Sequence, residues 1–300
     1  MQNSSRPVVE PERALVIGLG SMGKRYASLL TSMGVVEPSG LYLCDKNLEM
    51  KTEFACAHMA NDLDEILTRG LNDGGFDIIV IATPADTHLD ILAKVSQWCP
   101  FAGILIEKPL TDGALCEHPK VASLVPELFT RPIAVGYNWR FHPFAERIKE
   151  ISPALRDITL YVADEMDHWP GKYGNPLTEY SHEFDLIQYW TRSPIINYVN
   201  QTDDGYVVRG IHFGGKWSVK IRPHHQPKGR WVRIGLPDGS RVSYSWDTSE
   251  VEETYKDQLA EFVRCWATST HISDLTCPLV DGLKTALFVD TVYEILGSEK

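Results

Sequence analysis

The sequence lacks any run that approaches the roughly 18 consecutive apolar residues of a membrane-spanning helix. It also has no block of basic residues, and its net charge is −11. Such a chain is poorly suited to the phosphate backbone of a nucleic acid, and we expect neither a nucleic acid nor a membrane as its partner. The first 13 residues are polar, contain two prolines and lack the apolar core of a secretory signal peptide.

Residues for metal or disulfide chemistry are also sparse. The six cysteines form no CxxC pair, HExxH is absent, and no histidines and cysteines have the spacing of zinc ligands. We therefore expect no disulfide bond, no metal site and a reducing, cytoplasmic environment. The composition itself is that of a globular chain, 43% hydrophobic and 23% charged, and 300 residues suffice for about two domains.

The first part of the chain alternates short apolar segments with segments of helical periodicity. Asp62 and Glu65 have the spacing of a capping box, and Thr83 followed by Pro84 is typical of a helix start. Alternation of this kind predicts a parallel sheet covered by helices on both faces. The expected strands are residues 14–17, 41–44, 76–82 and 103–106, with a first helix at about 22–33.

The pattern changes near residue 133, where we place the boundary between domains 1–132 and 133–300. Consecutive short alternating strands after this point predict a mixed or antiparallel sheet. The expected elements are strands at 156–164, 195–201, 206–213, 216–222, 230–235 and 240–245, and helices at about 178–191, 253–268 and 279–296.

The motif with the clearest chemistry is the GxGxxG sequence of residues 18–23. It follows a predicted strand, opens a predicted helix, and is followed 22 residues after its last glycine by Asp45, at the end of the second strand. This context indicates a dinucleotide site, with the phosphates at the helix N-terminus. A glycine turn without a ligand is the alternative. The predicted cofactor contacts in this region are Gly18, Gly20, Ser21, Met22, Gly23, Asp45 and Lys46.

Asp45 and Lys46 point to different cofactors. A carboxylate at this place binds the ribose hydroxyls of NAD and repels the 2′-phosphate of NADP. The adjacent Lys46 could instead pair with that phosphate, so we expect NAD and keep NADP as possible.

Lys108 and His182 are candidate acid–base residues. Lys108 follows a predicted parallel strand and therefore faces the crevice where such sheets bind ligands. A solvated lysine paired with Glu107 is the alternative. His182 shares a helix face with Thr178, Glu179 and Asp185, which can tune an acid or base. A structural histidine is the alternative, and a metal site at these carboxylates is less favoured.

Aromatic residues surround these motifs in the sequence. Such rings can stack on a sugar or a nicotinamide ring, although core packing explains most aromatics equally well. The residues concerned are Trp139, Trp169, Tyr173, Tyr180 and Trp190.

Together these motifs resemble the Gfo/Idh/MocA family of oxidoreductases, and the matching elements follow one another along nearly the whole chain. They are Gly18–Gly23, Ile81–Pro84 with His88, Glu107–Pro109, Gly136–Phe141 and Ser181–Leu186, with the closing helices after Tyr255 and Asp281. The resemblance implies a doubly wound Rossmann domain with a parallel sheet, followed by a C-terminal α/β domain with an open, largely antiparallel sheet. It also implies a homodimer or homotetramer that is formed through this second sheet.

The resemblance assigns roles to individual residues. Lys108 would touch the nicotinamide and the substrate hydroxyls, and His182 would serve as an acid or base, with substrate between the two domains. Thr178 stands where many members have an aspartate, so Glu179 is the candidate replacement. The other implied cofactor contacts are Thr83, Pro84, His88, Glu107 and Arg140, and the implied substrate contacts include Asn138, Arg140, Trp169 and Tyr173.

The sequence thus predicts hydride transfer between a nicotinamide cofactor and a secondary alcohol or ketone of a sugar-like substrate or polyol. Two alternatives stay open. One is a non-catalytic nucleotide-binding sensor or scaffold, since fold does not fix function. The other is a reductase or NAD-dependent glycosidase of the same family that acts on a different substrate.

Overall fold

The structure is a computed structural model with two compact units. The first comprises Met1–Thr111, Cys116–Gly136 and Gln258–Gly282, and the second comprises Asp112–Leu115, Tyr137–Asp257 and Leu283–Lys300. The residues that the structure describes are 10–47, 54, 57–112, 115, 118, 120–121, 131–151, 155–165, 177, 180–191, 193–222, 224–246, 251–268 and 274–298.

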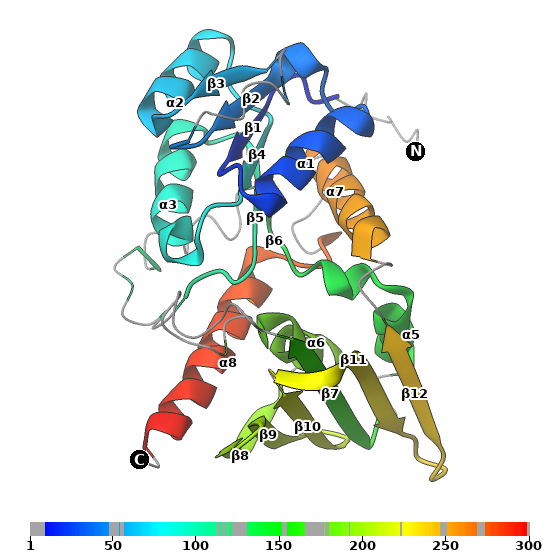
Figure 1. Ribbon diagram of the computed structural model, residues 1–300. Coiled ribbons are helices and arrows are strands. Elements are labelled where there is room, and N and C mark those ends of the chain that lie inside the picture. Colours follow the sequence, from blue (N-terminus) through cyan, green and yellow to red (C-terminus); the bar gives the residue numbers. More distant parts are fainter. Residues whose placement is uncertain are drawn as a thin grey trace, which may run out of the picture. The chain divides into compact units, whose positions relative to one another are not determined.

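The first unit is built on a six-stranded parallel sheet (Figure 1). Four of its strands are fully buried runs of four residues, which is typical of strands that helices cover on both faces. The strand order β3-β2-β1-β4-β5-β6 is that of a dinucleotide-binding fold. The strands are β1 (Ala14–Ile17), β2 (Leu41–Cys44), β3 (His58–Ala60), β4 (Ile78–Ile81), β5 (Gly103–Ile106) and β6 (Ile133–Val135).

Helices cover both faces of this sheet. Figure 1 shows α2 (Leu63–Asn72) and α3 (His88–Trp98) on one face, and α1 (Ser21–Ser32) and α7 (Val251–Ala267) on the other. The predicted cap is confirmed, because the Asp62 side chain accepts a hydrogen bond of 2.9 Å from the Glu65 amide. These helices and the parallel sheet confirm the predicted Rossmann architecture.

The predicted helix start at Thr83 is wrong. Pro84 has extended backbone angles and precedes a 3₁₀ turn, Ala85–Thr87, so the α-helix itself begins at His88. The Thr83 hydroxyl does not cap the helix. It accepts a hydrogen bond of 2.7 Å from the Thr87 hydroxyl.

The second unit holds a six-stranded sheet of order β12-β11-β7-β10-β9-β8. All neighbouring strands are antiparallel except β7 and β10, so the predicted largely antiparallel sheet is confirmed. The strands are β7 (Asp157–Glu165), β8 (Ile195–Thr202), β9 (Gly205–His212), β10 (Gly215–Arg222), β11 (His224–Gly235) and β12 (Arg241–Trp246).

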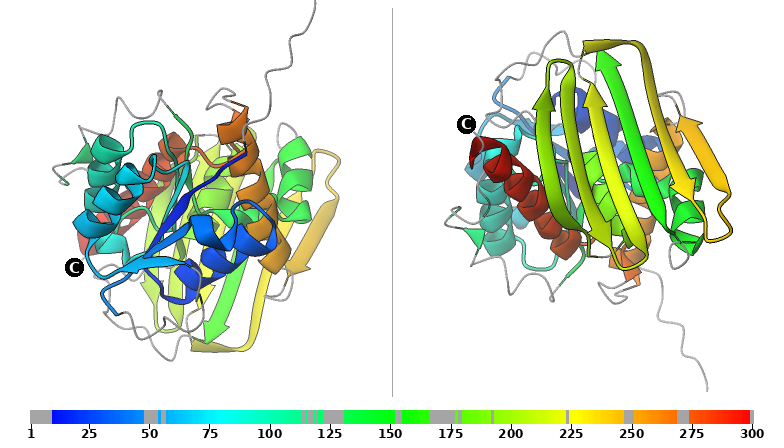
Figure 2. Two further views of the ribbon diagram at one scale, coloured as in Figure 1. Left: turned by 90° about the horizontal axis from the view of Figure 1, so that it is seen from above. Right: turned by 90° about the horizontal axis from the view of Figure 1, so that it is seen from below.

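One face of this second sheet carries the core of the unit. Side chains such as Trp217, Val219 and Val232 pack with α5 (Pro143–Ile151), α6 (Ser181–Thr191) and the later part of α8 (Leu279–Ser298). The right view of Figure 2 looks onto the other face, over which no described helix of this unit lies. A short 3₁₀ helix, η5 (Asn138–Phe141), precedes α5.

The observed units differ from the predicted division at residue 132. β6 pairs with β5 and belongs to the parallel sheet, although it lies just after the predicted boundary. Residues 258–282, which come late in the sequence, also belong to the first unit. Among the described residues, no helix combines the length and the apolar character that crossing a bilayer requires.

Candidate functional site

The glycine turn after β1 needs its glycines for different reasons. Gly18 has a φ of +88°, and a Cβ there would stand 2.6 Å from the Ala82 carbonyl oxygen at the end of β4. A Cβ on Gly23 would stand 1.7 Å from the Gly18 carbonyl oxygen, so the first turn of α1 packs directly on the glycine turn. Gly20 is exposed, and apart from Gly20 and its two chain neighbours no atom of the described residues lies within 4 Å of the place a Cβ would take. The turn is therefore tight on its protein side and open at Gly20.

The start of α1 is suited to bind a phosphate group. Its N-cap, Gly20, contributes no side-chain hydrogen bond, and no acidic residue lies in the first turn. No carboxylate in the first turn therefore offsets the positive end of the helix dipole or accepts hydrogen bonds from the N-terminal amides. Ser21 is exposed and Met22 is half-buried at this end. These features fit the pyrophosphate of a dinucleotide.

Asp45 connects the end of β2 to the glycine turn. One carboxylate oxygen accepts a hydrogen bond of 2.5 Å from the Leu19 amide, and the other accepts one of 2.8 Å from the Asn47 amide. The carboxylate stays partly exposed, and each oxygen can accept a further hydrogen bond. Asp45 can therefore hold the turn in place and still accept hydrogen bonds from ribose hydroxyls. Lys46 beside it is exposed.

His88 joins two loops at the carboxyl end of the sheet. Its ring nitrogens lie 2.7 Å from the Thr83 carbonyl oxygen and 2.9 Å from the Pro109 carbonyl oxygen. Burial lowers the pKa of His88, against the opposing effect of the two carbonyls. The side chain is only 1% exposed. His88 thus shapes the loops after β4 and β5, and the predicted direct contact between its side chain and the cofactor does not fit this enclosure.

Lys108 and Glu107 follow β5 directly, at the same sheet edge as the glycine turn. Lys108 is half-buried, whereas Glu107 is buried and 4% exposed. The Glu107 carboxylate accepts a hydrogen bond of 3.1 Å from the Lys108 amide. Lys108 therefore lies partly exposed at this edge, whereas Glu107 is buried, and the predicted direct contact between Glu107 and the cofactor does not fit this burial.

In the second unit, His182 lies in the first turn of α6 and is 7% exposed. Its ring stacks on Trp139 with the centroids 4.5 Å apart and the planes at 8°, and it meets Tyr137 edge to face at 5.8 Å. The Arg230 guanidinium lies 5.0 Å from the centre of the Trp139 ring. Arg230 was not predicted as a site residue. It lies in β11, far from the other site motifs in the sequence, and only the fold brings it next to Trp139. The aromatic rings fix the orientation of the imidazole.

Arg140 and Asp185 form a buried ion pair. Two guanidinium nitrogens donate to the two Asp185 oxygens at 2.8 and 2.7 Å, and the Thr285 hydroxyl donates to Asp185 at 3.0 Å. This ion pair, held by two hydrogen bonds, joins η5 to α6. Removing one partner would leave a buried charge uncompensated and would destabilise the folded protein. The predicted role of Arg140 at the boundary of nicotinamide and substrate does not fit this arrangement, because its guanidinium is 1% exposed and bonded within the core.

Asn138 keeps a polar atom that the protein does not use. Its side-chain nitrogen donates to the Thr254 hydroxyl at 2.7 Å, while its buried Oδ1 has no hydrogen-bond partner in the described part of the chain. Because Asn138 is 0% exposed, the predicted direct contact with substrate does not fit this enclosure, as is also the case for Arg140. Four other predicted positions, Thr178, Glu179, Trp169 and Tyr173, lie outside the described residues.

No group of three or more histidine, cysteine, aspartate or glutamate side chains is placed to hold a metal ion among the described residues. In the first unit, the candidate cofactor site consists, as far as it is described, of the glycine turn, the Asp45 carboxylate and Lys108. In the second unit, His182 is the acid–base candidate.

Part of the first unit is similar to a known protein family. Residues 13–127 match the family model GFO_IDH_MocA, described as an oxidoreductase family with an NAD-binding Rossmann fold. The match covers residues 13–127 of the 300-residue chain, and nearly all of these residues lie in the first unit. The predicted resemblance is confirmed, and so is NAD as the cofactor that the family binds.

Two curated relatives match parts of the chain. The rhizopine catabolism protein MocA of Rhizobium meliloti is 25% identical over 195 residues, which are 61% of this chain and 58% of that protein. The scyllo-inositol 2-dehydrogenase (NAD(+)) of Bacillus subtilis is 30% identical over 138 residues, 44% of this chain and 37% of that protein. The matches thus cover less than two thirds of either relative.

Solved structures show the same fold over nearly the whole chain. A myo-inositol dehydrogenase from Corynebacterium glutamicum matches with a TM-score of 0.77 and 15% identity, covering 96% of this chain and 97% of that one. GenD2 from gentamicin A biosynthesis, solved in complex with NAD, matches with a TM-score of 0.71 and 19% identity, covering 97% of both chains. At these identities the likeness concerns the fold of both units.

A first prediction concerns Asp45 and cofactor choice. Asp45→Asn removes the charge but keeps an oxygen that can accept the Leu19 amide hydrogen. Because a 2′-phosphate no longer meets a carboxylate, the ratio of NADPH to NADH dissociation constants should fall about tenfold, the scale of one lost charge contact. Fluorescence titration of both reduced cofactors measures this ratio, with the exposed Asp90→Asn as a control. Tighter binding of NADPH than NADH to the unaltered protein would contradict the assignment.

A second prediction concerns His88 and acid stability. Since burial holds the His88 pKa below its ordinary value of 6.5, the unfolded chain binds this proton more readily. Stability should therefore fall as the pH drops through 6.5, by at most about 1.4 kcal/mol per pH unit from this group. His88→Gln should have a lower melting temperature at about pH 7.5 and a shallower loss toward about pH 5. Parallel acid dependence in both proteins, followed by calorimetry, would show that His88 is not the group responsible.

Proposed function

We propose that the chain is an NAD-dependent dehydrogenase or reductase that transfers a hydride between the nicotinamide and a secondary alcohol or ketone of a polyol or sugar. The observation that carries this proposal is the position of Lys108. It follows β5 at the edge of the sheet where the glycine turn follows β1, and it is half-buried there. Ligands of open α/β sheets bind at this edge.

The glycine turn, the N-terminus of α1 and Asp45 would hold the dinucleotide, since they fit its pyrophosphate and ribose. When bound, NAD supplies the hydride acceptor or donor. The residues of the chain then have two tasks, which are to orient the substrate hydroxyl and to move its proton. The Lys108 ammonium can hold a hydroxyl oxygen by a hydrogen bond, and its neutral amine can accept the hydroxyl proton. His182, held by Trp139 and Tyr137, is the second group that can take this proton.

The proposed substrate class rests on two arguments. Inositol dehydrogenases occur among both the curated relatives and the solved structures. In the second unit, the Trp139 ring that stacks on His182 is a group that suits a hydroxylated ring. We therefore propose inositols and related sugars as substrates, and a cytoplasmic location on the basis of cysteine usage.

One observation favours a non-catalytic nucleotide-binding role as the second candidate. Asp185, the one described carboxylate of the predicted His182 face, is bonded to Arg140 and Thr285. The Asp185 carboxylate thus serves the ion pair with Arg140, and position 178 carries threonine where many members of the family have an aspartate. Binding of NAD without reduction by any polyol, sugar or sugar nucleotide would support the second candidate.

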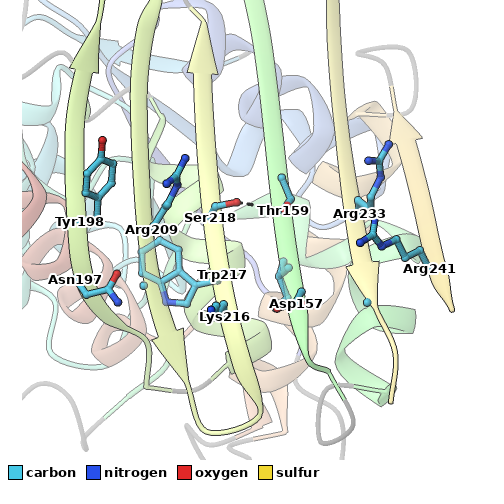
Figure 3. A pocket seen from close by; sticks show the side chains of 13 residues that line it. Asp157, Thr159, Asn197, Tyr198, Arg209, Lys216, Trp217, Ser218, Arg233 and Arg241 are labelled. Carbon is cyan, nitrogen blue, oxygen red and sulfur yellow. Dashed lines mark hydrogen bonds between the residues drawn. The ribbon is translucent and has the colours of Figure 1, made fainter. Parts of the chain in front are cut away.

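We also propose that the open face of the second sheet binds a second copy of the chain. A hollow of about 650 Å³ lies on this face, and none of the predicted site residues lines it. Figure 3 shows the side chains around this hollow. Three arginine side chains on the sheet lie over aromatic rings, as Arg209 over Tyr198, Arg222 over Tyr161 and Arg233 over Trp231. Arginine and aromatic residues are enriched in protein interfaces.

A third prediction tests the proton path. Lys108→Ala and His182→Ala should each lower turnover about a hundredfold or more, the usual scale for a positioned acid or base. Both variants should keep most of their NAD affinity, because neither residue belongs to the glycine turn. Turnover is followed by the absorbance of reduced nicotinamide across a panel of inositols, sugars and sugar nucleotides. Lys94→Ala, on the surface of α3, is the matched lysine control. Near-normal turnover in both variants would remove Lys108 and His182 from the proton path.

A fourth prediction tests the open sheet face. The double variant Arg209→Glu and Arg233→Glu should convert a dimer or tetramer into a smaller species, because both guanidinium groups would be replaced by carboxylates at the proposed contact. Light scattering coupled to size-exclusion chromatography measures the mass, and Lys94→Glu on the first unit serves as a charge-reversal control away from this sheet. A monomeric unaltered protein, or an unchanged mass in the double variant, would contradict this interface.

A further inference from the structure

The open face of the second sheet gathers positive charge around the hollow of about 650 Å³. Four exposed cations line this hollow, each on a different strand, and Asp157 is the one carboxylate among its described lining residues. The cations, which we call the sheet cations, are Arg209 on β9, Lys216 on β10, Arg233 on β11 and Arg241 on β12. The hollow is therefore locally positive in a chain whose net charge is −11.

The sheet cations form no ion pair with a carboxylate in the part of the chain that the structure describes. Other exposed cations do so, as Lys94 pairs with Asp64 at 2.6 Å and, on the same sheet, Arg222 pairs with Asp204 at 3.2 Å. Two of the sheet cations lie over aromatic rings, which hold a guanidinium group without neutralising its charge. The charges around the hollow are thus left for a group from outside this unit.

The strand register places two of the sheet cations in one row across the sheet. Arg209 of β9 lies opposite Ser218 of β10. Ser218 lies opposite Thr159 of β7, which in turn lies opposite Arg233 of β11. Three strand spacings of about 4.8 Å, or roughly 14 Å, therefore separate the backbones of the two arginines. Figure 3 shows the Ser218 and Thr159 hydroxyls between them. The row has short polar side chains at its centre and a long cation on either side.

The two hydroxyls at the centre of this row can donate a hydrogen bond to a ligand. The Ser218 hydroxyl lies 3.2 Å from the Thr159 hydroxyl, and both side chains are half-buried. The bond between them uses one of their two hydroxyl hydrogens, and no acceptor among the described residues binds the other. A hydroxyl donor with a guanidinium group on either side suits an oxyanion.

The adjacent row limits where an anion can lie. Lys216 lies opposite Asp157, and Asp157 lies opposite Gly235. Gly235 lies opposite Arg241 at the edge of this row. The Asp157 carboxylate repels an anion from the centre of the row, while Lys216 and Arg241 attract it from the two sides. The charges therefore favour a position over the neighbouring row of hydroxyls.

We propose that the hollow binds a small phosphate anion, with Arg209 and Arg233 as its principal contacts and the hydroxyl of Ser218 or Thr159 as a further donor. A guanidinium group donates two parallel hydrogen bonds to phosphate oxygens, which gives arginine an advantage over lysine at such a site. The site itself does not depend on the proposed contact between two copies of the chain.

The anion has a consequence for that contact, and this consequence rests on the proposed function of the open face. In a twofold symmetric contact, the same surface of each copy faces the other. The sheet cations of both copies would then repel each other, and an anion bound between them would neutralise part of their charge. The proposed contact should therefore be stronger with phosphate present than without it.

Calorimetric titration of the full chain with inorganic pyrophosphate tests the site. Arg209→Gln combined with Arg233→Gln should weaken binding more than about tenfold, because two charged hydrogen-bond donors are lost. The control Lys94→Gln combined with Arg222→Gln removes the same charge outside the hollow and should leave the affinity unchanged. Equal affinity and stoichiometry in the first double variant would overturn the proposal, since they would place the anion elsewhere, as at the glycine turn. Absence of binding to the unaltered protein would overturn it as well.

Further measurements keep the outcome decisive. If the first double variant fails to fold, Lys216→Gln combined with Arg241→Gln replaces it and should weaken binding in the same direction by a smaller factor. A single-stranded oligothymidine that binds more tightly than pyrophosphate, and loses this binding in the same variant, would assign the hollow to a nucleic acid and overturn the small anion.

Light scattering with and without pyrophosphate separates the anion site from the contact between copies. One pyrophosphate per two chains, together with a larger mass, would support both proposals. One pyrophosphate per chain on a protein that stays monomeric would support the anion site and defeat the proposed contact.

Discussion

The site depends on the close packing of the glycine turn against the end of β4. Gly18 must adopt a left-handed backbone beside Ala82, and Gly23 must lie against the Gly18 carbonyl, before α1 can begin where it does. The turn then presents Gly20 and the helix amides at the carboxyl edge of the sheet. Asp45 stabilises this conformation from β2 by binding the Leu19 amide. Because the strands are parallel, Lys108 follows β5 at this same edge of the sheet.

Much of the first unit could be predicted because its strands are short runs of apolar residues and its turns carry glycine and aspartate. β3 escaped prediction, since His58, Met59 and Ala60 are only three residues of weak strand preference. The start of α3 was misjudged because proline after threonine is typical of a helix N-terminus, but here Pro84 precedes a 3₁₀ turn. The assignment of residues 258–282 to the first unit needs contacts between distant parts of the sequence, which periodicity does not reveal.

For the site, the sequence predicted residue types better than their environments. The glycines, Asp45 and Lys108 lie where their motifs indicated. His88, Glu107 and Arg140 are instead enclosed, and each is tied to a group that sequence spacing could not identify, respectively two carbonyls, the Lys108 amide and Asp185. Such buried polar residues act on their neighbours, because in a low dielectric each hydrogen bond or charge strongly constrains the group beside it. In a similar way, Trp139 constrains His182 by stacking on its ring, and Arg230 lies over the Trp139 ring.

The central claim is that this site carries out hydride transfer and does not merely bind a nucleotide. The most direct measurement is mass spectrometry of the cofactor after incubation of the unaltered protein with NAD and inositols that carry deuterium on the ring carbons. The account predicts that at least one inositol yields reduced cofactor with one deuterium gained. Tight binding of NAD with no reduced or deuterated cofactor, across inositols and the wider sugar panel, would contradict it.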